Sequence, residues 1–563
     1  MTAKTRNIIR IALLFGLLLL PIFYALFTAI DLEYSLAKKM AYLLVIILLL
    51  LIPAMILKAR VYFIVEGMFN FLFFPIDIAS LYLNRQSASA AFLQNIFHTD
   101  SNEAGELLLS MWPVCLAVVV LWCIYFLLAA RVENQYLLGK KWSRILLVIT
   151  AVCAVLGFAI MAVYMKHLHR ERTWADVMPD ALGAVTSKFY KMYPYNLYIN
   201  SLDVLMTERE QRRMQKEVES FSFDLFPTDK PSPELYFLVL GEAARYDHWG
   251  MHGYERNTSP LLAQTDNLIS FDSIFTQANR TATSIPLLLT RATADVPELA
   301  YREKSLPEAA QELGFRASYL SNQTLTTLTG RITNACDDSY CSGKALDVDG
   351  NYDEQFIPLI RGFMTDSSQF FILHTIGCHF RYEQRYPKAF EVYQPVFGTS
   401  FSHAMVTEEH KDKLVNAYDN AILYTDYFLR QLINYADSLN RAAVILYISD
   451  HGESFWDDDR KLALHGSYQV CETEYHVPMF VWYSQEYADS YPDKVRMLQA
   501  NKSKTASSDI VFHSMLDILG GCPVADATKS ICSPSFVARD TLTLLTGAGI
   551  VDRFTVDDLK IRH

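Results

Sequence analysis

Long apolar segments and shorter apolar runs divide the chain into two parts. Within the first 165 residues, five segments have the length and composition of membrane-spanning helices, which take about 20 residues each. They are residues 8–30, 40–57, 62–83, 108–130 and 145–165. The third contains Glu66, Pro75 and Asp77, which are costly in lipid, so we expect that helix to be broken or tilted. The first is longer than the apolar core of a signal peptide and is interpreted as an uncleaved anchor.

The orientation of these segments follows from the positive charges of the short loops. Lys and Arg gather before the first segment, between the second and third, and between the fourth and fifth. Such loops stay in the cytoplasm, so the N-terminus is expected there and everything after residue 165 outside. We therefore divide the chain into a five-helix membrane domain (residues 1–165), an interfacial connector with clustered tyrosines (residues 166–230) and an outer domain (residues 231–563).

The outer part alternates short apolar runs with amphipathic stretches. Strands are predicted at residues 234–241, 268–275, 317–321, 370–376, 444–448 and 477–482, and helices at residues 307–313 and 411–434. Strands that alternate with helices form a mainly parallel sheet with helices on both faces. The predicted fold class of the outer domain is therefore an α/β/α sandwich.

Several predicted strands end in polar residues. The run over residues 444–448 stops at Ser449 and is followed by Asp450 and His451, and the run over residues 234–241 is followed by Glu242. The carboxyl ends of strands are where open α/β sheets bind ligands. Carboxylate oxygens and imidazole nitrogens suit a divalent metal such as zinc.

Two further histidines support a metal site over an acidic surface turn. His379 follows the predicted strand at residues 370–376, and His465 lies in a loop after the Asp450-His451 pair. A single histidine in such a position is more often structural. Convergence of several strand ends on Glu, Asp and His is much less easily accidental.

A hydroxyl-rich segment precedes another predicted helix. Thr281-Ala282-Thr283-Ser284 runs into Ile285-Pro286 and an apolar stretch, and Pro fits the first turn of a helix. Backbone amides at a helix N-terminus favour anions such as phosphate. A Thr or Ser there is most often only a helix cap, and the residues alone do not rank Thr281, Thr283 and Ser284.

Charge and cysteine content narrow the function classes. A net charge of −11 argues against nucleic acid as a partner, because binding to phosphates needs a basic face. Cys336 and Cys341 form one short-range pair, and Cys522 and Cys532 form another. Outside the cytoplasm such pairs predict disulfides. Zinc binding is the alternative, although neither pair has the Cys-x2-Cys spacing.

The loop between the third and fourth apolar segments has polar groups at helical spacing. Asn95, Thr99 and Glu103 recur every four residues and would fall near one helix face. By spacing alone, an ordinary solvated face is the favoured interpretation.

Together these motifs resemble the phosphoethanolamine transferases of Gram-negative envelopes, which are lipid A-modifying enzymes of the alkaline phosphatase-like superfamily. The resemblance covers nearly the whole chain. The motifs that carry it are Gly241-Glu242, Thr281-Ala282-Thr283-Ser284-Ile285-Pro286, Ser321-Asn322-Gln323, Ser449-Asp450-His451-Gly452-Glu453-Ser454 and Leu464-His465-Gly466.

The resemblance implies a role for each motif residue. It makes Thr281 the nucleophile and a ligand, together with Glu242, Asp450 and His451, of a zinc site with one or two Zn²⁺ ions. His379 and His465 would hold the transferred phosphate group or a second zinc. It also implies that Asn95, Thr99 and Glu103 belong to a loop that contacts the substrate. This replaces the interpretation as a solvated helix face, which their spacing alone favours.

The chain departs from the family pattern in three places. The cysteines that often bracket the nucleophile are replaced here by Ala278 or Asn279 and by Leu287. The Lys that commonly follows the Ser-Asn-Gln motif has no clear match, and Arg331 is a possible substitute. The hydroxyl residue usually found after the glutamate is also missing. These departures concern the acceptor more than the chemistry.

The implied reaction transfers phosphoethanolamine from phosphatidylethanolamine through a covalent intermediate on Thr281. The implied acceptor is lipid A, the lipopolysaccharide core or another envelope glycan. The enzyme would be a monomer of the bacterial inner membrane with a periplasmic catalytic domain. Its product would change surface charge and resistance to cationic peptides such as polymyxin.

Three alternatives have specific sequence arguments. A sulfatase needs Cys or Ser followed by x-Pro-x-Arg, and the Arg position after Ser284 holds Leu288. A lipoteichoic acid synthase would transfer glycerol phosphate and is disfavoured by the Asn95 loop and the paired cysteines. A catalytically inactive membrane sensor would hold no tightly bound metal.

Overall fold

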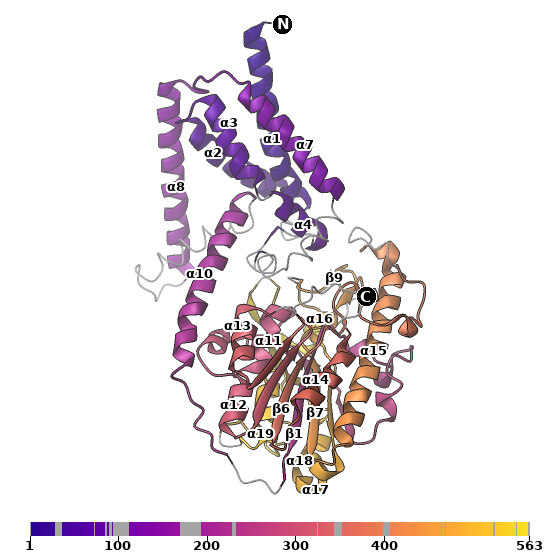
Figure 1. The fold of residues 1–563 in the computed structure, drawn as a ribbon. Coiled ribbons are helices and arrows are strands. Elements are labelled where there is room, and N and C mark those ends of the chain that lie inside the picture. Colours follow the sequence, from indigo (N-terminus) through magenta and orange to yellow (C-terminus); the bar gives the residue numbers. More distant parts are fainter. Residues whose placement is uncertain are drawn as a thin grey trace. The chain divides into compact units, whose positions relative to one another are not determined.

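The computed structural model describes two compact units, one of residues 1–97 and 111–207 and one of residues 98–110 and 208–563 (Figure 1). Within them the described residues are 2–28, 36–72, 74–84, 87–88, 93, 112–168, 193–227, 232–323, 325–342, 352–397, 406–467, 469–521, 524–547 and 549–560.

The first unit is helical. Its elements are α1 (Ala3–Thr28), α2 (Leu36–Ala54), α3 (Ala59–Phe71), α4 (Phe74–Asn84), α7 (Trp112–Ala130) and α8 (Lys140–Leu168), and α10 (Tyr195–Val218) leads onward. Among the described residues, three helical stretches are long and apolar enough to cross a membrane: Ala3–Thr28, Ala59–Leu81 and Lys141–Ile160. The remaining two predicted spans are the helices α2 and α7, whose apolar stretches, Tyr42–Ala54 and Leu116–Ala130, are shorter. The predicted number of five spans is therefore not confirmed.

The third predicted span contains two helices, α3 and α4, and its polar residues have partners inside the same unit. Asn70 Nδ2 donates to Glu66 Oε2 at 3.1 Å. Asp77 Oδ1 accepts hydrogen bonds from Ala88 N and Asn196 Nδ2, both at 2.9 Å. These internal hydrogen bonds offset the cost of placing polar groups within an apolar segment.

The second unit is built on a seven-stranded sheet with the order β2-β10-β7-β1-β6-β4-β5. β1 pairs in parallel with β6 and β7, and β4 pairs in parallel with β5 and β6. β10 runs antiparallel to both β7 and β2. The strands are β1 (Leu235–Gly241), β2 (Leu268–Phe271), β4 (Arg316–Ser321), β5 (Asp338–Cys341), β6 (Gln369–His374), β7 (Ala443–Ser449) and β10 (Met479–Tyr483).

The mainly parallel sheet is confirmed, with one correction. The run over residues 268–275 forms two strands, β2 and β3 (Ile274–Phe275). β3 leaves the main sheet and pairs with β11 (Ala506–Ser507). Asp272 and Ser273 separate the two strands, and the Asp272 amide donates to Lys502 O at 3.0 Å. The chain therefore turns away from the sheet before reaching the segment that carries Thr281.

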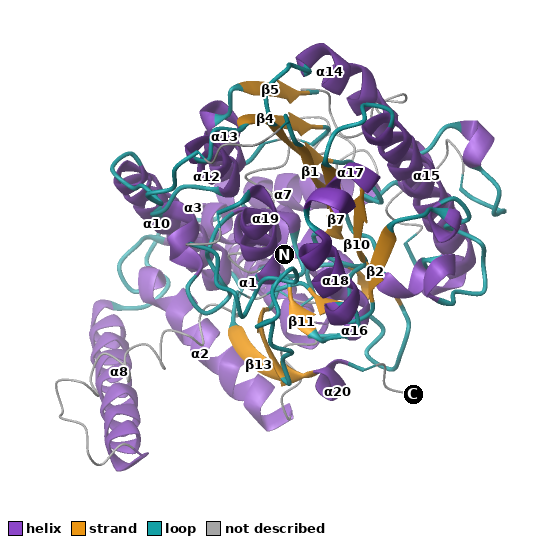
Figure 2. Ribbon diagram, turned by 90° about the horizontal axis from the view of Figure 1, so that it is seen from below, coloured by secondary structure: helices purple, strands orange, loops and turns teal. Residues whose placement is uncertain are grey.

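Helices cover both faces of the sheet, which makes the unit an α/β/α sandwich (Figures 1 and 2). One face packs against α11 (Thr281–Leu289), α12 (Leu306–Glu312), α13 (Thr327–Ala335) and α19 (Ile510–Leu519). The other packs against α14 (Phe356–Phe363) and the long α15 (Lys411–Asp437).

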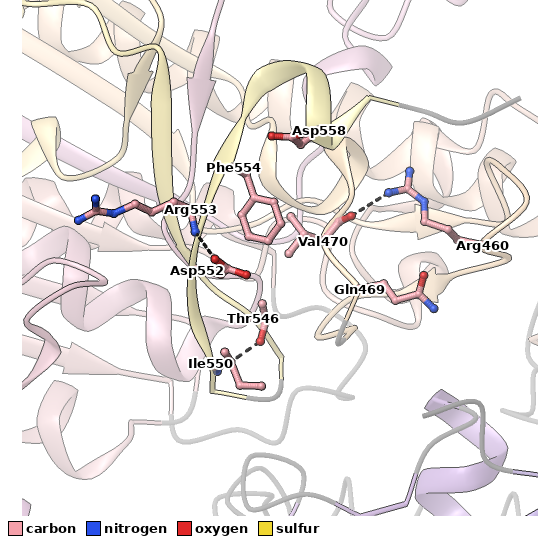
Figure 3. Close-up of a pocket in the computed structure, with 9 residues that line it drawn as sticks. All are labelled: Arg460, Gln469, Val470, Thr546, Ile550, Asp552, Arg553, Phe554 and Asp558. Atoms are coloured by element: carbon pink, nitrogen blue, oxygen red, sulfur yellow. Dashed lines mark hydrogen bonds between the residues drawn. The ribbon is translucent and has the colours of Figure 1, made fainter. Parts of the chain in front are cut away.

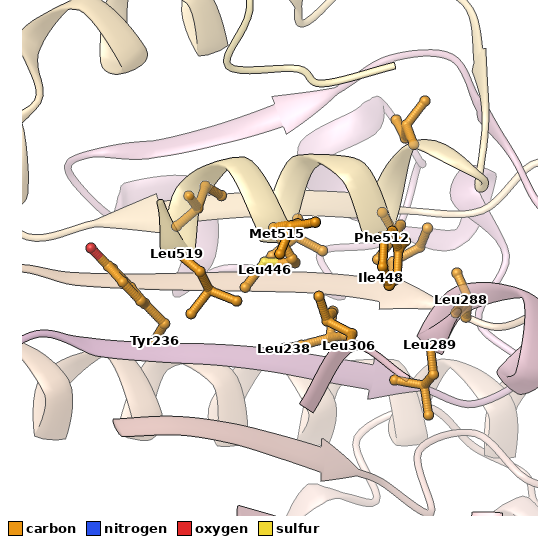
Figure 4. Close-up of a cluster of buried hydrophobic side chains, with 14 of the residues drawn as sticks. Tyr236, Leu238, Leu288, Leu289, Leu306, Leu446, Ile448, Phe512, Met515 and Leu519 are labelled. Atoms are coloured by element: carbon orange, nitrogen blue, oxygen red, sulfur yellow. The ribbon is translucent and has the colours of Figure 1, made fainter. Parts of the chain in front are cut away.

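Alternate residues of the central strands enter opposite cores, as the period of two in a strand requires. Leu238 of β1 and Leu446 and Ile448 of β7 pack against α19 in one core (Figure 4). Phe237 and Ile445, their neighbours along the chain, belong to the other. Burial on both faces explains why these strands are continuous apolar runs in the sequence.

The predicted disulfide between Cys336 and Cys341 is wrong for this structure, where both thiols are free. Cys336 follows α13 and Cys341 ends β5, so the strand lies between them. At about 3.3 Å per strand residue their Cα atoms are on the order of 15 Å apart, whereas a disulfide needs about 4.4–6.8 Å. Cys522 lies outside the described residues, so its pairing with Cys532 stays a prediction.

Candidate metal and nucleophile site

Four predicted residues meet at the carboxyl ends of β1 and β7. Gly241 pairs with Ser449 in the parallel register, so Glu242 and Asp450 emerge side by side. Ligand atoms of Glu242, Asp450 and His451 all lie within 4.8 Å of one another, and all three residues are fully buried. Thr281, at the start of α11, donates its hydroxyl hydrogen to Glu242 Oε2 at 3.0 Å. Its Oγ1 also lies 3.2 Å from His451 Nε2.

Two carboxylate oxygens in this cluster have no hydrogen-bond partner. They are Glu242 Oε1 and Asp450 Oδ2, which lie 3.3 Å and 3.5 Å from His451 Nε2. Buried oxygens of this kind are costly unless a cation or a hydrogen bond satisfies them. Two carboxylates, one imidazole and a hydroxyl form a donor set of oxygens and one nitrogen that fits a divalent metal ion.

Backbone contacts hold the Asp450-His451 pair in this orientation. Asp450 Oδ1 accepts the amides of Ala243 at 3.1 Å and of His451 at 2.7 Å, which leaves Oδ2 for the cluster. His451 Nδ1 lies 2.8 Å from Gly452 O. Because a carbonyl only accepts, Nδ1 carries the hydrogen and Nε2 faces the cluster as a potential ligand.

Gln323 fixes Glu242 from the opposite side. Its side-chain amide donates to Glu242 Oε2 at 2.8 Å and to Thr375 O at 2.7 Å, so it links β4, β6 and the strand end at Glu242. Gln323 belongs to the Ser-Asn-Gln motif, to which the sequence assigned no role. The preceding Asn322 binds the buried Asp353, whose carboxylate accepts the amides of Ile376 and Gly377. The motif therefore stabilises two neighbouring loops of the site.

Charges in the cluster shift one another's protonation. Burial opposes a charge on His451, but the adjacent Asp450 and Glu242 raise its pKa to about 10. Burial raises the pKa of Asp450, and the Glu242 charge raises it further. Burial also disfavours ionised Glu242, yet its close ion pair with His451 holds its pKa well below its ordinary value. The protein thus gathers more negative charge here than one histidine neutralises.

The structure distinguishes the three hydroxyl residues that the sequence left unranked. Ser284 is buried, and its Oγ donates to the Asp450 carbonyl oxygen at 2.7 Å. Thr276 Oγ1 donates to the same oxygen at 2.6 Å. Thr283 makes only a 3.4 Å contact with Arg280 Nη2. Thr281 alone of the three points its hydroxyl at the ligand cluster.

Ser284→Ala is expected to lower the free energy of unfolding by about 1 kcal/mol, because one buried hydrogen bond is lost while Thr276 still serves the same carbonyl. Turnover should fall less than about tenfold. Thermal melting and activity of the full chain test this, with Thr283→Ala as the matched control that changes neither. A loss of activity as complete as in Thr281→Ala would contradict the structural role of Ser284.

Both additional histidines lie beside the cluster. The rings of His465 and His451 have centroids 4.2 Å apart, and His465 Nδ1 lies 3.1 Å from Glu453 Oε1. His379 is close enough for the charge of Glu242 to affect it, although burial dominates and lowers its pKa to about 4. Neutral imidazoles can donate to phosphate oxygens or bind a metal.

Three other predicted residues lie outside the described part of the chain, and one is placed elsewhere. Asn95, Thr99 and Glu103 belong to the first group. Arg331 is on α13, where its guanidinium donates to Glu308 Oε2 at 3.0 Å. No described contact links Arg331 to the ligand cluster, so the structure does not support it as a substitute for the missing lysine.

Sequence reasoning missed two acidic residues and one histidine. Asp353 holds the loop before His379, and Glu453 orients His465. His374 ends β6, is buried, and accepts or donates a 3.1 Å hydrogen bond at Nδ1 with Tyr319, while its Nε2 has no partner. The spacing His374-x4-His379 was available as a signal, because His374 lies near the end of the predicted strand at residues 370–376 and His379 follows it.

Family models match two stretches of the chain. A model described as "Sulfatase" matches residues 234–521, and one described as "Phosphoethanolamine transferase EptA/EptB" matches residues 88–174. The first covers the sheet and all the ligand-cluster residues. The second covers the loop with Asn95, Thr99 and Glu103.

Curated relatives share the same description. The chain is 29% identical over 299 residues to the "Kdo(2)-lipid A phosphoethanolamine 7''-transferase" of Escherichia coli, covering 51% of this chain and 50% of the relative. It is 30% identical over 308 residues to phosphoethanolamine transferase EptA of Salmonella typhimurium, covering 51% and 53%. The chain thus spans about half the length of these two relatives. The match to EptC of Escherichia coli is 24% identical and covers 80% of this chain and 78% of the relative.

Solved structures share the fold. The integral membrane lipooligosaccharide phosphoethanolamine transferase A of Neisseria meningitidis superposes with a TM-score of 0.69 at 19% identity, covering 94% of this chain and 98% of that one. The periplasmic domain of Escherichia coli EptC, solved in complex with Zn, gives a TM-score of 0.52 at 23% identity and covers 60% of this chain.

Proposed function

Because the chain belongs to the sulfatase family and, within the alkaline phosphatase-like superfamily, groups with the phosphoethanolamine transferases, we propose that it transfers phosphoethanolamine from phosphatidylethanolamine to an envelope acceptor. The favoured acceptor is lipid A or the lipopolysaccharide core. The observation that carries the proposal is the position of the Thr281 hydroxyl. Its oxygen lies 3.0 Å from Glu242 Oε2 and 3.2 Å from His451 Nε2, within a buried cluster of potential metal ligands.

In the first step, Thr281 Oγ1 attacks the phosphorus of the donor. A bond forms between Oγ1 and phosphorus, the bond to the diacylglycerol oxygen breaks, and the hydroxyl proton leaves Thr281. Glu242 Oε2 already accepts that proton in a hydrogen bond, so an acceptor is in place. Covalent catalysis of this kind divides one difficult displacement into two easier ones.

The cluster fits zinc, with Glu242, Asp450, His451 and Thr281 as the residues that would hold it. Bound there, zinc supplies a Lewis acid that lowers the pKa of the Thr281 hydroxyl and neutralises phosphate charge. His379 and His465 donate hydrogen bonds to the phosphoryl oxygens or hold a second ion. The site would hold one or two ions.

In the second step, an acceptor hydroxyl or phosphate attacks the phosphorus of the Thr281 adduct. A new bond forms between the acceptor oxygen and phosphorus, the bond to Oγ1 breaks, and the acceptor's proton returns to Thr281 through Glu242. Charge stabilisation and positioning suffice for phosphoryl transfer. Adding phosphoethanolamine offsets anionic charge at the cell surface, which would reduce binding of cationic peptides such as polymyxin.

The membrane part has a role in this proposal because donor and acceptor are both lipids. We propose five spans, a cytoplasmic N-terminus and a periplasmic catalytic domain in the bacterial inner membrane, with the enzyme acting as a monomer. Asn95, Thr99 and Glu103 contact the lipid substrate.

Sulfate ester hydrolysis is the main rival, and a specific observation weighs against it. In the sulfatase pattern Ser284 would be the modified nucleophile, but its Oγ is buried and donates to the Asp450 carbonyl. Leu288 occupies the position where that pattern needs Arg, and it lies fully buried in the apolar core.

Mass spectrometry of lipid A, core oligosaccharide and periplasmic glycans, with and without the protein, tests the proposal. We expect phosphoethanolamine in at least one pool only when the protein is present. The purified chain should also release diacylglycerol from phosphatidylethanolamine. An unchanged pattern in every pool, with no diacylglycerol release, would overturn the proposed function.

A further inference from the structure

A cavity lies next to the loop that carries His465. It has a volume of about 540 Å³ and is formed by the C-terminal hairpin of β12 (Thr541–Leu545) and β13 (Val551–Thr555), the short helix α20 (Val556–Leu559), and the chain before Cys471 (Figure 3). Its lining residues are Arg460, Gln469, Val470, Thr546, Ile550, Asp552, Arg553, Phe554 and Asp558. The volume is within the range of about 300–1,000 Å³ typical of small-molecule sites.

The hairpin is joined directly to the segment that holds the nucleophile. The Leu545 amide donates to Gln277 O at 2.7 Å, and Leu545 forms a parallel bridge with Ala278, three residues before Thr281. Asn279 Nδ2 donates to Ser467 O at 3.0 Å, which ties that segment to the loop after His465. One network of hydrogen bonds therefore connects the hairpin, the loop and the segment that carries Thr281.

The hairpin that lines the cavity packs directly on the loop after His465. Gly547 follows the lining residue Thr546 and packs so closely on the loop that a Cβ there would lie 2.0 Å from the Gly466 carbonyl oxygen. Its amide also donates to Ser467 O at 3.1 Å. His465 and Gln469 are four positions apart, which limits their Cα distance to about 14 Å. The cavity therefore lies within a few residues of the loop that carries His465.

The lining has the chemistry of a sugar-binding site more than that of an anion or lipid-tail site. Phe554 packs beside Val470 on the small apolar cluster that includes Leu542 and Leu544, and the part of its ring that stays exposed lines the cavity (Figure 3). Asp552 contributes an exposed carboxylate, and Gln469 contributes both a donor and an acceptor. Asp558 also lines the cavity, but its Oδ2 accepts the amide and hydroxyl hydrogens of Thr555, which caps α20. A sugar ring offers the matching surfaces, with an apolar C–H face for the aromatic ring and hydroxyls around its edge.

The two arginines of the lining do not make it an anion site. Arg460 forms a buried ion pair with Asp458, and its Nη1 donates to Val470 O at 2.7 Å. Arg553 extends away from the other lining side chains in Figure 3, and its side chain is 74% exposed. The cavity consequently presents more carboxylate than free cationic charge, which disfavours a bare phosphate.

We propose that this cavity binds the carbohydrate part of the acceptor and thereby presents an acceptor oxygen to the Thr281 adduct. Phe554 stacks on a sugar ring, and Asp552 and Gln469 bind its hydroxyls. The proposal rests on the proposed function for the identity of the reaction, but the binding of a glycan to the cavity can be measured without any turnover.

The test uses the full chain carrying Thr281→Ala, so that nothing is consumed, and titrates it calorimetrically with fully deacylated lipid A, which is a phosphorylated sugar backbone without tails. Phe554→Ala and Asp552→Asn are each expected to raise the dissociation constant about tenfold, by removing a stacking face and a charged hydrogen-bond acceptor. Asp557→Asn is the matched control, since Asp557 lies on α20 outside the lining and pairs with Lys560.

A second arm uses the otherwise native chain with phosphatidylethanolamine. Asp552→Asn should lower transfer to lipid A through KM and leave diacylglycerol release without acceptor within about twofold. Melting temperatures show whether Phe554→Ala still folds. If it does not, the result for Asp552→Asn alone tests the proposal, because Asp552 is exposed and its substitution should not affect folding. Equal dissociation constants for Asp552→Asn and Asp557→Asn would overturn the proposal. Glycan binding that depends on Asp552 in a chain without transferase activity would uphold the cavity and reject the proposed function.

Discussion

Thr281→Ala is expected to reduce phosphoethanolamine transfer by about 10⁴-fold, because the substitution removes the only hydroxyl of its segment that reaches the ligand cluster. The fold should survive, since both hydrogen-bond contacts of the Thr281 side chain lie inside the site. Diacylglycerol release from phosphatidylethanolamine in detergent micelles measures the first step directly. Metal-independent background hydrolysis sets the floor of the assay.

Thr281→Ser and Thr283→Ala are the informative controls. Serine keeps the hydroxyl and should retain part of the activity, whereas Thr283→Ala removes a hydroxyl of the same helical turn that only contacts Arg280 at 3.4 Å. Mass spectrometry of the native chain quenched with donor and no acceptor should find phosphoethanolamine on the peptide containing Thr281. Normal turnover by Thr281→Ala, or a modified peptide from another segment, would refute the covalent role.

The sheet and the ligand cluster were accessible from sequence because both depend on short-range patterns. β1 and β7 are uninterrupted apolar runs buried on both faces, and each stops abruptly at a polar residue. Parallel neighbours end at the same edge, so Glu242 and Asp450 had to be close once the two strands were adjacent. The family resemblance then identified Thr281, which no local pattern could distinguish from Thr283 and Ser284.

The hydrogen bonds that hold the ligand cluster in place could not be predicted from the sequence, because they join residues far apart in the chain. Gln323 reaches Glu242 across 81 positions, and Ser284 reaches the Asp450 carbonyl across 166. Neither pairing leaves a periodic or local signal. Cys336 and Cys341 are separated by only four residues, which predicted a disulfide. That prediction failed for a related reason: a strand lies between the two cysteines and keeps their thiols apart. The number of residues in a loop does not report the distance it spans.

The C-terminal hairpin was missed entirely. β12 and β13 are short, and only Leu542 and Leu544 of β12 are fully buried, so the apolar signal is weak. The hairpin gains its place through backbone bonds to the Thr281 segment, and these depend on main-chain atoms that any sequence provides. Gly547 packs closely on a different segment, the loop after His465, and is a local sign of that second contact.

Asp450→Asn is expected to remove bound zinc and transfer activity together, yet to leave the metal-free protein at least as stable as the metal-free native chain. The native cluster holds two buried carboxylate oxygens without hydrogen-bond partners, Glu242 Oε1 and Asp450 Oδ2. Asparagine replaces one of the two negative charges with a neutral amide and retains Oδ1 for the Ala243 amide. Repulsion within the empty site therefore falls while the ligand set is broken.

Metal analysis and melting of the full chain separate these effects. The native chain should contain at least about one zinc, and chelation should lower its melting temperature, since an ion present at about 1,000 times its dissociation constant stabilises the folded state by about 4 kcal/mol. Asp450→Asn should contain almost none and should not respond to chelator. Glu303→Gln, which alters an ion pair with Arg291 away from the cluster, is the control that behaves as native.

A second equivalent of zinc that disappears with His379→Ala and His465→Ala would assign those residues to a second ion. Full zinc content in Asp450→Asn would falsify the proposed ligand set, because this carboxylate lies at its centre, within 3.5 Å of His451 Nε2.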